Sequence, residues 1–227
     1  MGLIINIETA TDVCSVVLAL DGRILAKKEE KAGQSHARLL TTFITECLKE
    51  SGFHLPDLNA VAVSKGPGSY TGLRIGVSTA KGLCYGLEIP LISVNTLQSM
   101  ASQFLNLYSH IPGTWICPMI DARRMEVYTA FFNESLEFER PTAAEIIETG
   151  IFEEILNQNP VVFLGDGMPK TMKYFENHIN ASFCPEFEPS ASGMVLFSEL
   201  AYKNQLFEDV AYFQPFYLKN FFTHKQP

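Results

Sequence analysis

Histidine and cysteine are the side chains that would hold a metal in this chain, but their spacing fits no metal site. No two of the five histidines stand four residues apart, so no helix would present an imidazole pair, and the HExxH motif is absent. The five cysteines are odd in number and form no CxxC pair, which argues against a zinc ribbon and a disulfide framework. We therefore expect no metal, and we expect the cysteines to be small buried residues in a reducing cytosol.

Glycine-containing stretches that would approach a phosphate give an equally weak signal. Residues 66–72 lack the spacing and the Lys-Ser/Thr pair of a P-loop. Gly165 and Gly167 follow an apolar run, and this Gly-x-Gly is either a relic nucleotide loop or a tight turn. Ser69 directly follows a glycine and so does not match GxSxG, and we predict that it caps a helix. The sequence thus predicts no cofactor and no catalytic residue, with Gly165 and Gly167 as relic candidates.

The elements that must position these residues are those of an α/β protein. Asp21-Gly22 lies between two apolar runs and predicts a hairpin, so the chain opens with three antiparallel strands. Apolar residues three and four apart predict amphipathic helices farther along. The first half reads βββαβαβα, with strands at 3–7, 13–20, 23–26, 60–63 and 91–94 and helices between 34 and 52, at 70–85 and at 96–107.

The second half reads as a looser copy of the first. Residues 109–113 combine Pro and Gly and predict a boundary, which gives an N-terminal lobe of residues 1–108 and a C-terminal lobe of residues 109–227. We expect strands at 115–120, 126–132, 136–138 and 161–164 and helical segments at 143–148, 151–157, 169–177 and 194–203.

Composition narrows the functional classes. The 227 residues are 47% hydrophobic with a net charge of −8, which excludes a disordered chain and makes a stand-alone nucleic-acid binder a poor fit. No apolar run approaches the roughly 18 residues of a membrane span, and the N-terminus lacks the basic region of a signal peptide. We therefore expect a soluble cytoplasmic protein without membrane contact.

Four motifs together match a known family. They are Ile-Glu-Thr-Ala-Thr at 7–11, Gly-Pro-Gly-Ser-Tyr-Thr-Gly-Leu-Arg at 66–74, Asp-Ala-Arg-Arg-Met-Glu-Val-Tyr at 121–128 and Pro-Phe-Tyr-Leu-Lys at 215–219. With them the chain resembles the TsaB (YeaZ) family over essentially its whole length. The resemblance implies an α/β fold of the actin/Hsp70/sugar-kinase (ASKHA) class, with two RNase H-like lobes, mixed β-sheets and a degenerate second lobe.

The resemblance also implies a function. It suggests a non-catalytic scaffold subunit of the complex that forms N6-threonylcarbamoyladenosine at position 37 of tRNAs reading ANN codons. The implied partners are the catalytic subunit TsaD and the ATPase TsaE, with a homodimer when the chain is alone and tRNA contact only through the complex. ATP and metal would bind to the partners. An active small-molecule kinase of the ASKHA fold is the alternative.

Two departures from the fold's active members favour the scaffold. TsaD-like proteins carry His-x-x-x-His on the first helix, whereas His36 is followed at that spacing by Leu40, which cannot bind a metal. Nucleotide-binding members use Asp-x-Gly in the first hairpin to let the backbone approach a phosphate. The corresponding stretch here is Glu8-Thr9-Ala10, where a Cβ stands in place of the glycine hydrogen.

A stripe of small residues on the predicted second helix suggests a close helix contact. Gly72, Gly76, Ala80 and Cys84 are spaced by four and fall on one line of the helix, although glycine costs a helix roughly 0.5–1 kcal/mol. The stripe packs either on this chain's own sheet or first helix or on a partner, and the resemblance favours a partner. Gly76→Leu would then abolish pairing and leave the monomer folded. The predicted contacts from this helix are Gly72, Leu73, Ile75, Gly76, Val77 and Ala80.

The first helix completes the predicted interface. Its apolar stripe is wider than one sheet contact needs, so Leu39, Leu40, Phe43 and Cys47 are expected to share their area between core and partner; a fully internal helix is the alternative. His36 is either a structural or an interface residue. Arg123, Arg124 and Glu126 are either a solvated strand edge or a contact to TsaE or tRNA.

Overall fold

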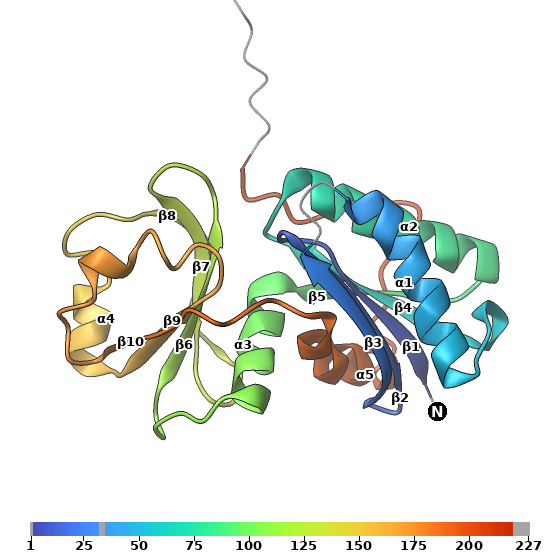
Figure 1. Cartoon of the computed structure of the whole chain (residues 1–227), viewed down its shortest axis with the longest axis horizontal. Coiled ribbons are helices and arrows are strands. Elements are labelled where there is room, and N and C mark those ends of the chain that lie inside the picture. Colours follow the sequence, from blue (N-terminus) through green and yellow to red (C-terminus); the bar gives the residue numbers. More distant parts are fainter. Residues whose placement is uncertain (1, 32–34, 220–227) are drawn as a thin grey trace, which may run out of the picture.

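The computed structural model describes residues 2–31 and 35–219, which form two lobes, each built on a five-stranded mixed sheet (Figure 1). The first sheet has the order β3-β2-β1-β4-β5 and the second β10-β9-β6-β7-β8. The first-sheet strands are β1 (Leu3–Glu8), β2 (Val13–Leu20), β3 (Arg23–Lys31), β4 (Ala60–Gly66) and β5 (Leu91–Asn95). The second-sheet strands are β6 (Trp115–Asp121), β7 (Glu126–Phe132), β8 (Phe138–Ile146), β9 (Val161–Leu164) and β10 (Ala181–Cys184).

The first sheet is buried on both faces, and its central strands β1 and β4 consist mostly of apolar residues. β1 pairs antiparallel with β2 and parallel with β4. Side chains alternate along a strand, so Ile5 and Ile7 face the core under α1 (His36–Ser51) and α2 (Tyr70–Leu87), while Ile4 faces the opposite core. This topology places the end of β1 and the start of α2 at the same edge of the sheet.

The two lobes exchange helices. Helix α3 (Thr96–Leu107) follows β5 but contributes to a core of the second sheet. Helix α5 (Val195–Lys203) and the short turn η3 (Ala191–Met194) follow the second sheet but pack on the first, against residues that include Ile4. Helix α4 (Glu153–Gln158) covers the other face of the second sheet. Residues beyond 190 therefore complete the core of the first lobe, and the division at residue 108 stays a prediction.

A buried polar network ties the crossing segment to the first sheet. Ser190 Oγ donates to Glu29 Oε2 at 2.7 Å, and the backbone N–H of Ala191 donates to Ser15 Oγ at 3.0 Å. Ser15 Oγ also donates to Glu29 Oε2 at 3.2 Å. Gln103 Oε1 of α3 accepts from the Ser190 N–H at 2.8 Å. Strands β2 and β3, helix α3 and the crossing segment thus share one hydrogen-bond network.

The α/β fold class and the element order of the first half are confirmed. Gly52 ends α1 in the left-handed conformation, Ser69 caps α2 by accepting from the Gly72 N–H, and all five cysteines are buried and free. Asn95 caps helix α3 by accepting from the Gln98 N–H. Within the described residues no helix has the length and hydropathy to span a bilayer.

Two expectations for the second half are wrong, and one strand was not predicted. Residues 143–146 continue β8 instead of forming a helix, because Ala143 and Ala144 pair with β7, and this pairing overrides the helix propensity of alanine. Residues 169–177 form turns around the 3₁₀ turn η2 (Met172–Tyr174). Most of their backbone hydrogen bonds join residues three apart, as in a 3₁₀ helix, and not four apart, as in an α-helix. Strand β10 was not expected, because four residues give too short a pattern.

Candidate functional site

The hairpin loop between β1 and β2 is where an active member of this fold would approach a phosphate. Glu8, the last residue of β1, is fully buried beside this loop, and its Oε1 accepts from the Ala10 N–H at 2.6 Å and from Ser64 Oγ at 2.9 Å. Burial raises the pKa of Glu8 to about 7, against the lowering effect of these hydrogen bonds. The Glu8 carboxyl group therefore binds the backbone of this loop.

The raised pKa of Glu8 predicts a pH-dependent stability. Between pH 4.5 and about 7 the folded chain holds a proton that the unfolded chain has released, so the free energy of unfolding falls as pH rises through this window. The loss is about 3 kcal/mol at most. Glu8→Gln stays neutral and is expected to lack it. Urea unfolding of both proteins at pH 5 and pH 8 measures the difference, and equal pH dependence would contradict this assignment.

The start of α2 closes the same loop from outside. Ser69 N–H donates to Ala10 O at 2.7 Å, and Thr9 Oγ1 donates to Gly72 O at 2.8 Å. A Cβ on Gly72 would lie closer than 3.0 Å to the carbonyl oxygen of Thr9, and one on Gly68 would meet the backbone of Ala10. The protein's own helix thus fills the space beside the loop.

Within residues 2–31 and 35–219 no three His, Cys, Asp or Glu side chains are grouped to hold a metal.

Gly165 and Gly167 form a tight turn after β9. Gly165 has a φ of +92°, and a Cβ on it would meet the carbonyl of Met119 on β6. Gly167 N–H donates to the same carbonyl at 3.0 Å, and a Cβ on Gly167 would lie closer than 3.0 Å to the backbone of Ile120. Packing against β6 therefore explains both glycines, and the expected absence of a cofactor stays a prediction.

The predicted interface residues do not lie where the sequence suggested. Gly72 and Gly76 face the chain's own Thr9, so the small-residue stripe packs on the first sheet, the alternative that had been left open. Of the eleven residues only Leu39 and Ile75 are partly exposed. The others are buried inside the monomer and cannot contact a partner directly: His36, Leu40, Phe43, Cys47, Gly72, Leu73, Gly76, Val77 and Ala80.

The structure changes what was expected of His36 and of a substitution at Gly76. His36 Nε2 lies 2.9 Å from Thr11 O, so the histidine is a structural brace of the hairpin loop. A Cβ on Gly76 would lie closer than 3.0 Å to Thr9 Oγ1 and in contact with Val63, so a leucine there would damage the monomer. Gly76→Leu therefore does not isolate pairing from folding.

The sides of α1 and α2 that face away from the first sheet are exposed. On α2 this side carries Thr71, Ser78, Gly82 and Tyr85, which we call the outer face of α2. The added Cβ of an alanine at Gly82 would have no atom within 4 Å, and the same holds for Gly86. The exposed side of α1 carries mostly small and charged residues, among them Ala37, Arg38, Thr41, Thr45 and Glu46. A second chain can thus approach α2 closely.

A segment that sequence reasoning left unplaced runs beside α2. Residues 205–219, which we call the C-terminal strap, follow α5 and bring Tyr217 to a ring-centroid distance of 5.0 Å from Tyr70. The Arg74 guanidinium lies 4.0 Å above the Tyr70 ring, and its Nε donates to Tyr217 Oη at 3.4 Å. Lys219 forms an ion pair with Glu126 of β7.

The strap thereby joins three of the sequence motifs. Residues 215–219 contact the 66–74 motif in the first lobe and the 121–128 motif in the second. In the latter, Asp121 Oδ1 accepts from the Arg123 N–H at 2.6 Å, and Arg123 and Arg124 both have positive φ, so their exposed side chains leave from a tight turn. Their contact to TsaE or tRNA stays a prediction. The sequence feature that these segments share is that each belongs to one of the four motifs of the family.

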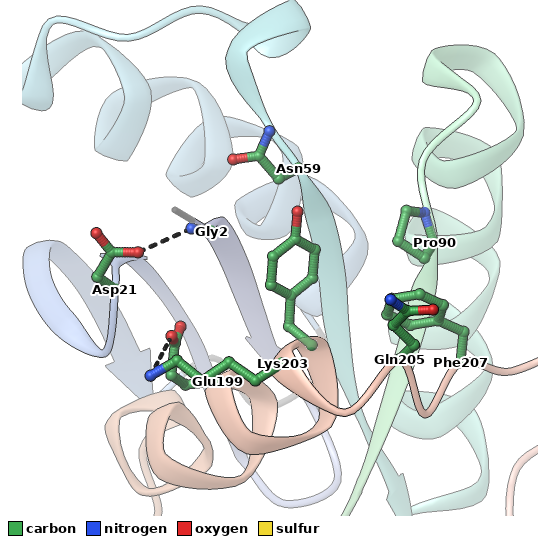
Figure 2. Close-up of a pocket in the computed structure, with 9 residues that line it drawn as sticks. Gly2, Asp21, Asn59, Pro90, Glu199, Lys203, Gln205 and Phe207 are labelled. Carbon is green, nitrogen blue, oxygen red and sulfur yellow. Dashed lines mark hydrogen bonds and ion pairs between the residues drawn. The ribbon is translucent and has the colours of Figure 1, made fainter.

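Two cavities lie away from the four sequence motifs. One of about 430 Å³ lies at the other end of the first sheet, where Gly2, Asp21 and Tyr202 contribute to its wall. Figure 2 shows Asp21 joined to the N–H of Gly2, and Glu199 paired with Lys203. Another of about 400 Å³ lies between α3 and α5. Neither includes a residue of the four motifs, so the outer face of α2 and the strap are the candidate site.

Comparisons with known proteins agree with the motifs. The family described as "TsaD: tRNA N6-adenosine threonylcarbamoyltransferase" matches residues 27–217. The tRNA threonylcarbamoyladenosine biosynthesis protein TsaB of Escherichia coli (strain K12) is 41% identical over 127 residues, which are 56% of this chain and 53% of that protein. TsaB of Bacillus subtilis (strain 168) is 32% identical over 167 residues, 71% of this chain and 70% of that protein.

Solved structures confirm the fold class. A Pseudomonas aeruginosa protein described as similar to peptidase YEAZ superposes with a TM-score of 0.84 at 23% identity, covering 96% of this chain and 100% of the other. ASKHA-type proteins share the two-sheet arrangement at lower similarity. These likenesses concern the backbone fold, and the chemistry must be argued from the residues described above.

Proposed function

This chain belongs to the TsaB (YeaZ) family of tRNA threonylcarbamoyladenosine biosynthesis proteins, and from that premise we propose that it is a non-catalytic scaffold subunit. In this role it binds a TsaD-type catalytic subunit and works with a TsaE-type ATPase to form N6-threonylcarbamoyladenosine at position 37 of tRNAs reading ANN codons. Its tRNA contact is made only within the complex. It acts in the cytoplasm and forms a homodimer when its partner is absent.

The observation that supports a non-catalytic role is the blocked hairpin loop. Its Ala10 N–H is bonded to Glu8, and the start of α2 packs against the backbone of Thr9 and Ala10. A phosphate loop needs free backbone N–H groups and an open approach. Here the Ala10 N–H is already bonded and α2 packs against the loop, which supports the proposal that ATP and metal bind to the partners.

We expect the isolated chain not to bind ATP at low micromolar concentration. Titration calorimetry with Mg²⁺-ATP measures this directly, and thin-layer assay of phosphate transfer to a panel of sugars measures kinase activity. Tight binding together with phosphoryl transfer would replace the scaffold by the alternative, a small-molecule kinase of the same fold.

The family match supports a TsaD-type partner. The family model that matches residues 27–217 is named for the threonylcarbamoyltransferase TsaD, and the matched range includes both α1 and α2. Two chains of one fold can pair pseudo-symmetrically through the same surface, as identical chains do around a two-fold axis. The outer face of α2, with an open Cβ position at Gly82, is suited to close helix–helix contact.

Subunit omission tests the proposed function. Purified chain, TsaD-type subunit, TsaE-type ATPase, threonylcarbamoyl adenylate, ATP and unmodified tRNA are combined, and modified adenosine is quantified by mass spectrometry. We expect product from the complete mixture and none when this chain is left out. Undiminished product without the chain would refute the scaffold role.

A further inference from the structure

The C-terminal strap follows the edge of the first sheet and then α2. Glu208 N–H donates to Leu91 O of β5 at 2.8 Å. Farther along, Phe216 N–H donates to Lys65 O at 2.7 Å, next to the start of α2. The strap therefore covers an open strand edge, which by itself would be a sufficient structural role.

One turn of the strap is braced more heavily than edge covering requires. Asp209 Oδ1 accepts from the N–H groups of Ala211 and Tyr212 at 2.8 and 3.0 Å, and Asp209 O accepts from the Phe213 N–H at 2.8 Å. From α2, Lys81 Nζ donates to the carbonyls of Ala211 and Phe213 at 3.0 and 3.1 Å. Five hydrogen bonds thus fix the backbone on both sides of Tyr212.

The same turn is anchored in the core and points one aromatic ring outward. Val210 and Phe213 pack against the core under α1 and α2. Tyr212 between them is 83% exposed. A fixed backbone with an exposed tyrosine loses little conformational entropy on binding, and tyrosine is enriched among the residues that dominate interface affinity.

Tyr212 borders the outer face of α2. Lys81, which reaches the strap, stands one helical turn before Tyr85 on the same side of α2. Tyr85 is also 83% exposed, and Gly82 and Gly86 beside it carry no side chain. The strap therefore extends the outer face of α2 along one flank.

We propose that the C-terminal strap is a third element of the surface that binds the TsaD-type subunit, with Tyr212 as its aromatic anchor. This inference rests on the proposed function and names a part of its interface that lies outside the two helices. The occupant is a protein surface, because the carboxylates of Glu208 and Asp209 flank the turn and disfavour the phosphates of RNA. The continuity with the outer face of α2 assigns the occupant to the same partner.

Affinity measurements on the full chain test this inference. Binding of the TsaD-type subunit is measured by calorimetry for wild type, Tyr212→Ala, Tyr212→Phe and Lys81→Met. We expect Tyr212→Ala to weaken binding by roughly tenfold or more and Tyr212→Phe to bind like wild type, because the ring supplies the contact. Lys81→Met removes two braces and is expected to weaken binding several-fold. Thermal unfolding of Tyr212→Ala should match wild type, since the ring is exposed.

Each outcome separates the inference from the proposed function. If Tyr212→Ala binds like wild type while a substitution at Gly82 breaks the complex, the strap has only a structural role and the scaffold stands. If Tyr212→Ala dissociates the homodimer but leaves the heteromeric affinity unchanged, the strap binds a second copy and the inference is overturned. If wild type fails to bind the TsaD-type subunit, the proposed function and this inference both fail.

Discussion

Replacing Gly72 with alanine is expected to destabilise the monomer by about 3 kcal/mol or more. The added Cβ would lie closer than 3.0 Å to the carbonyl oxygen of Thr9, a backbone atom that cannot rotate away. Either α2 must lift from the sheet or the end of β1 must move, and Thr9 Oγ1 would lose its hydrogen bond to Gly72 O. Urea unfolding followed by circular dichroism measures the free energy change.

The matched control is Gly82→Ala on the same helix. Its Cβ meets no atom within 4 Å, and alanine is the better helix former, so this variant is expected to gain about 0.5–1 kcal/mol. The two variants add the same methyl group to one helix, and only its surroundings differ. Equal stabilities of the two variants would show that the stripe is not packed on the first sheet as described.

Placing arginine at Gly82 is expected to break the complex with the TsaD-type subunit. The long charged side chain would stand where another helix must approach, and burying an unpaired charge costs about 3–5 kcal/mol. At 1.4 kcal/mol per tenfold this weakens binding by roughly 100-fold or more. Formation of threonylcarbamoyladenosine in the reconstituted mixture should fall with it, whereas thermal stability should not.

A second arginine variant controls for the added charge. Ile179→Arg introduces the same side chain at a position that is 96% exposed in the second lobe. It is expected to bind and to support modification like wild type. Should Gly82→Arg assemble with undiminished affinity, the partner uses another surface, and the assignment to the outer face of α2 would have to be given up.

Local patterns predicted the elements that depend on local interactions. Asp21-Gly22 places a two-residue turn between β2 and β3, and Gly52 and Ser69 end and begin their helices, as expected. The second half was harder because its strands are completed by distant partners. Ala143 is a good helix former that belongs to a strand only because β7 lies beside it.

The candidate site shows the same division between local and distant information. The spacing of Gly72 and Gly76 indicated a close contact but could not indicate with what. Gly72 faces the backbone of Thr9, which is 63 residues away in the chain, and Gly76 faces the side chain of Thr9. The strap's contacts to α2 span even greater separations, 130 residues between Lys81 and Ala211. Periodicity describes a face of a helix and carries no information about what covers it.

The exchange of helices between the lobes has a consequence for biosynthesis on the ribosome. The first sheet is translated early, yet the elements that cover Ile4 and its neighbours on one face, η3 and α5, emerge last. The nascent chain must therefore carry an apolar sheet surface through most of its synthesis, which is a hazard for aggregation before release. A truncated transcript ending before codon 191 should yield a product that chaperones retain, and full solubility should return only when the final helix has been added.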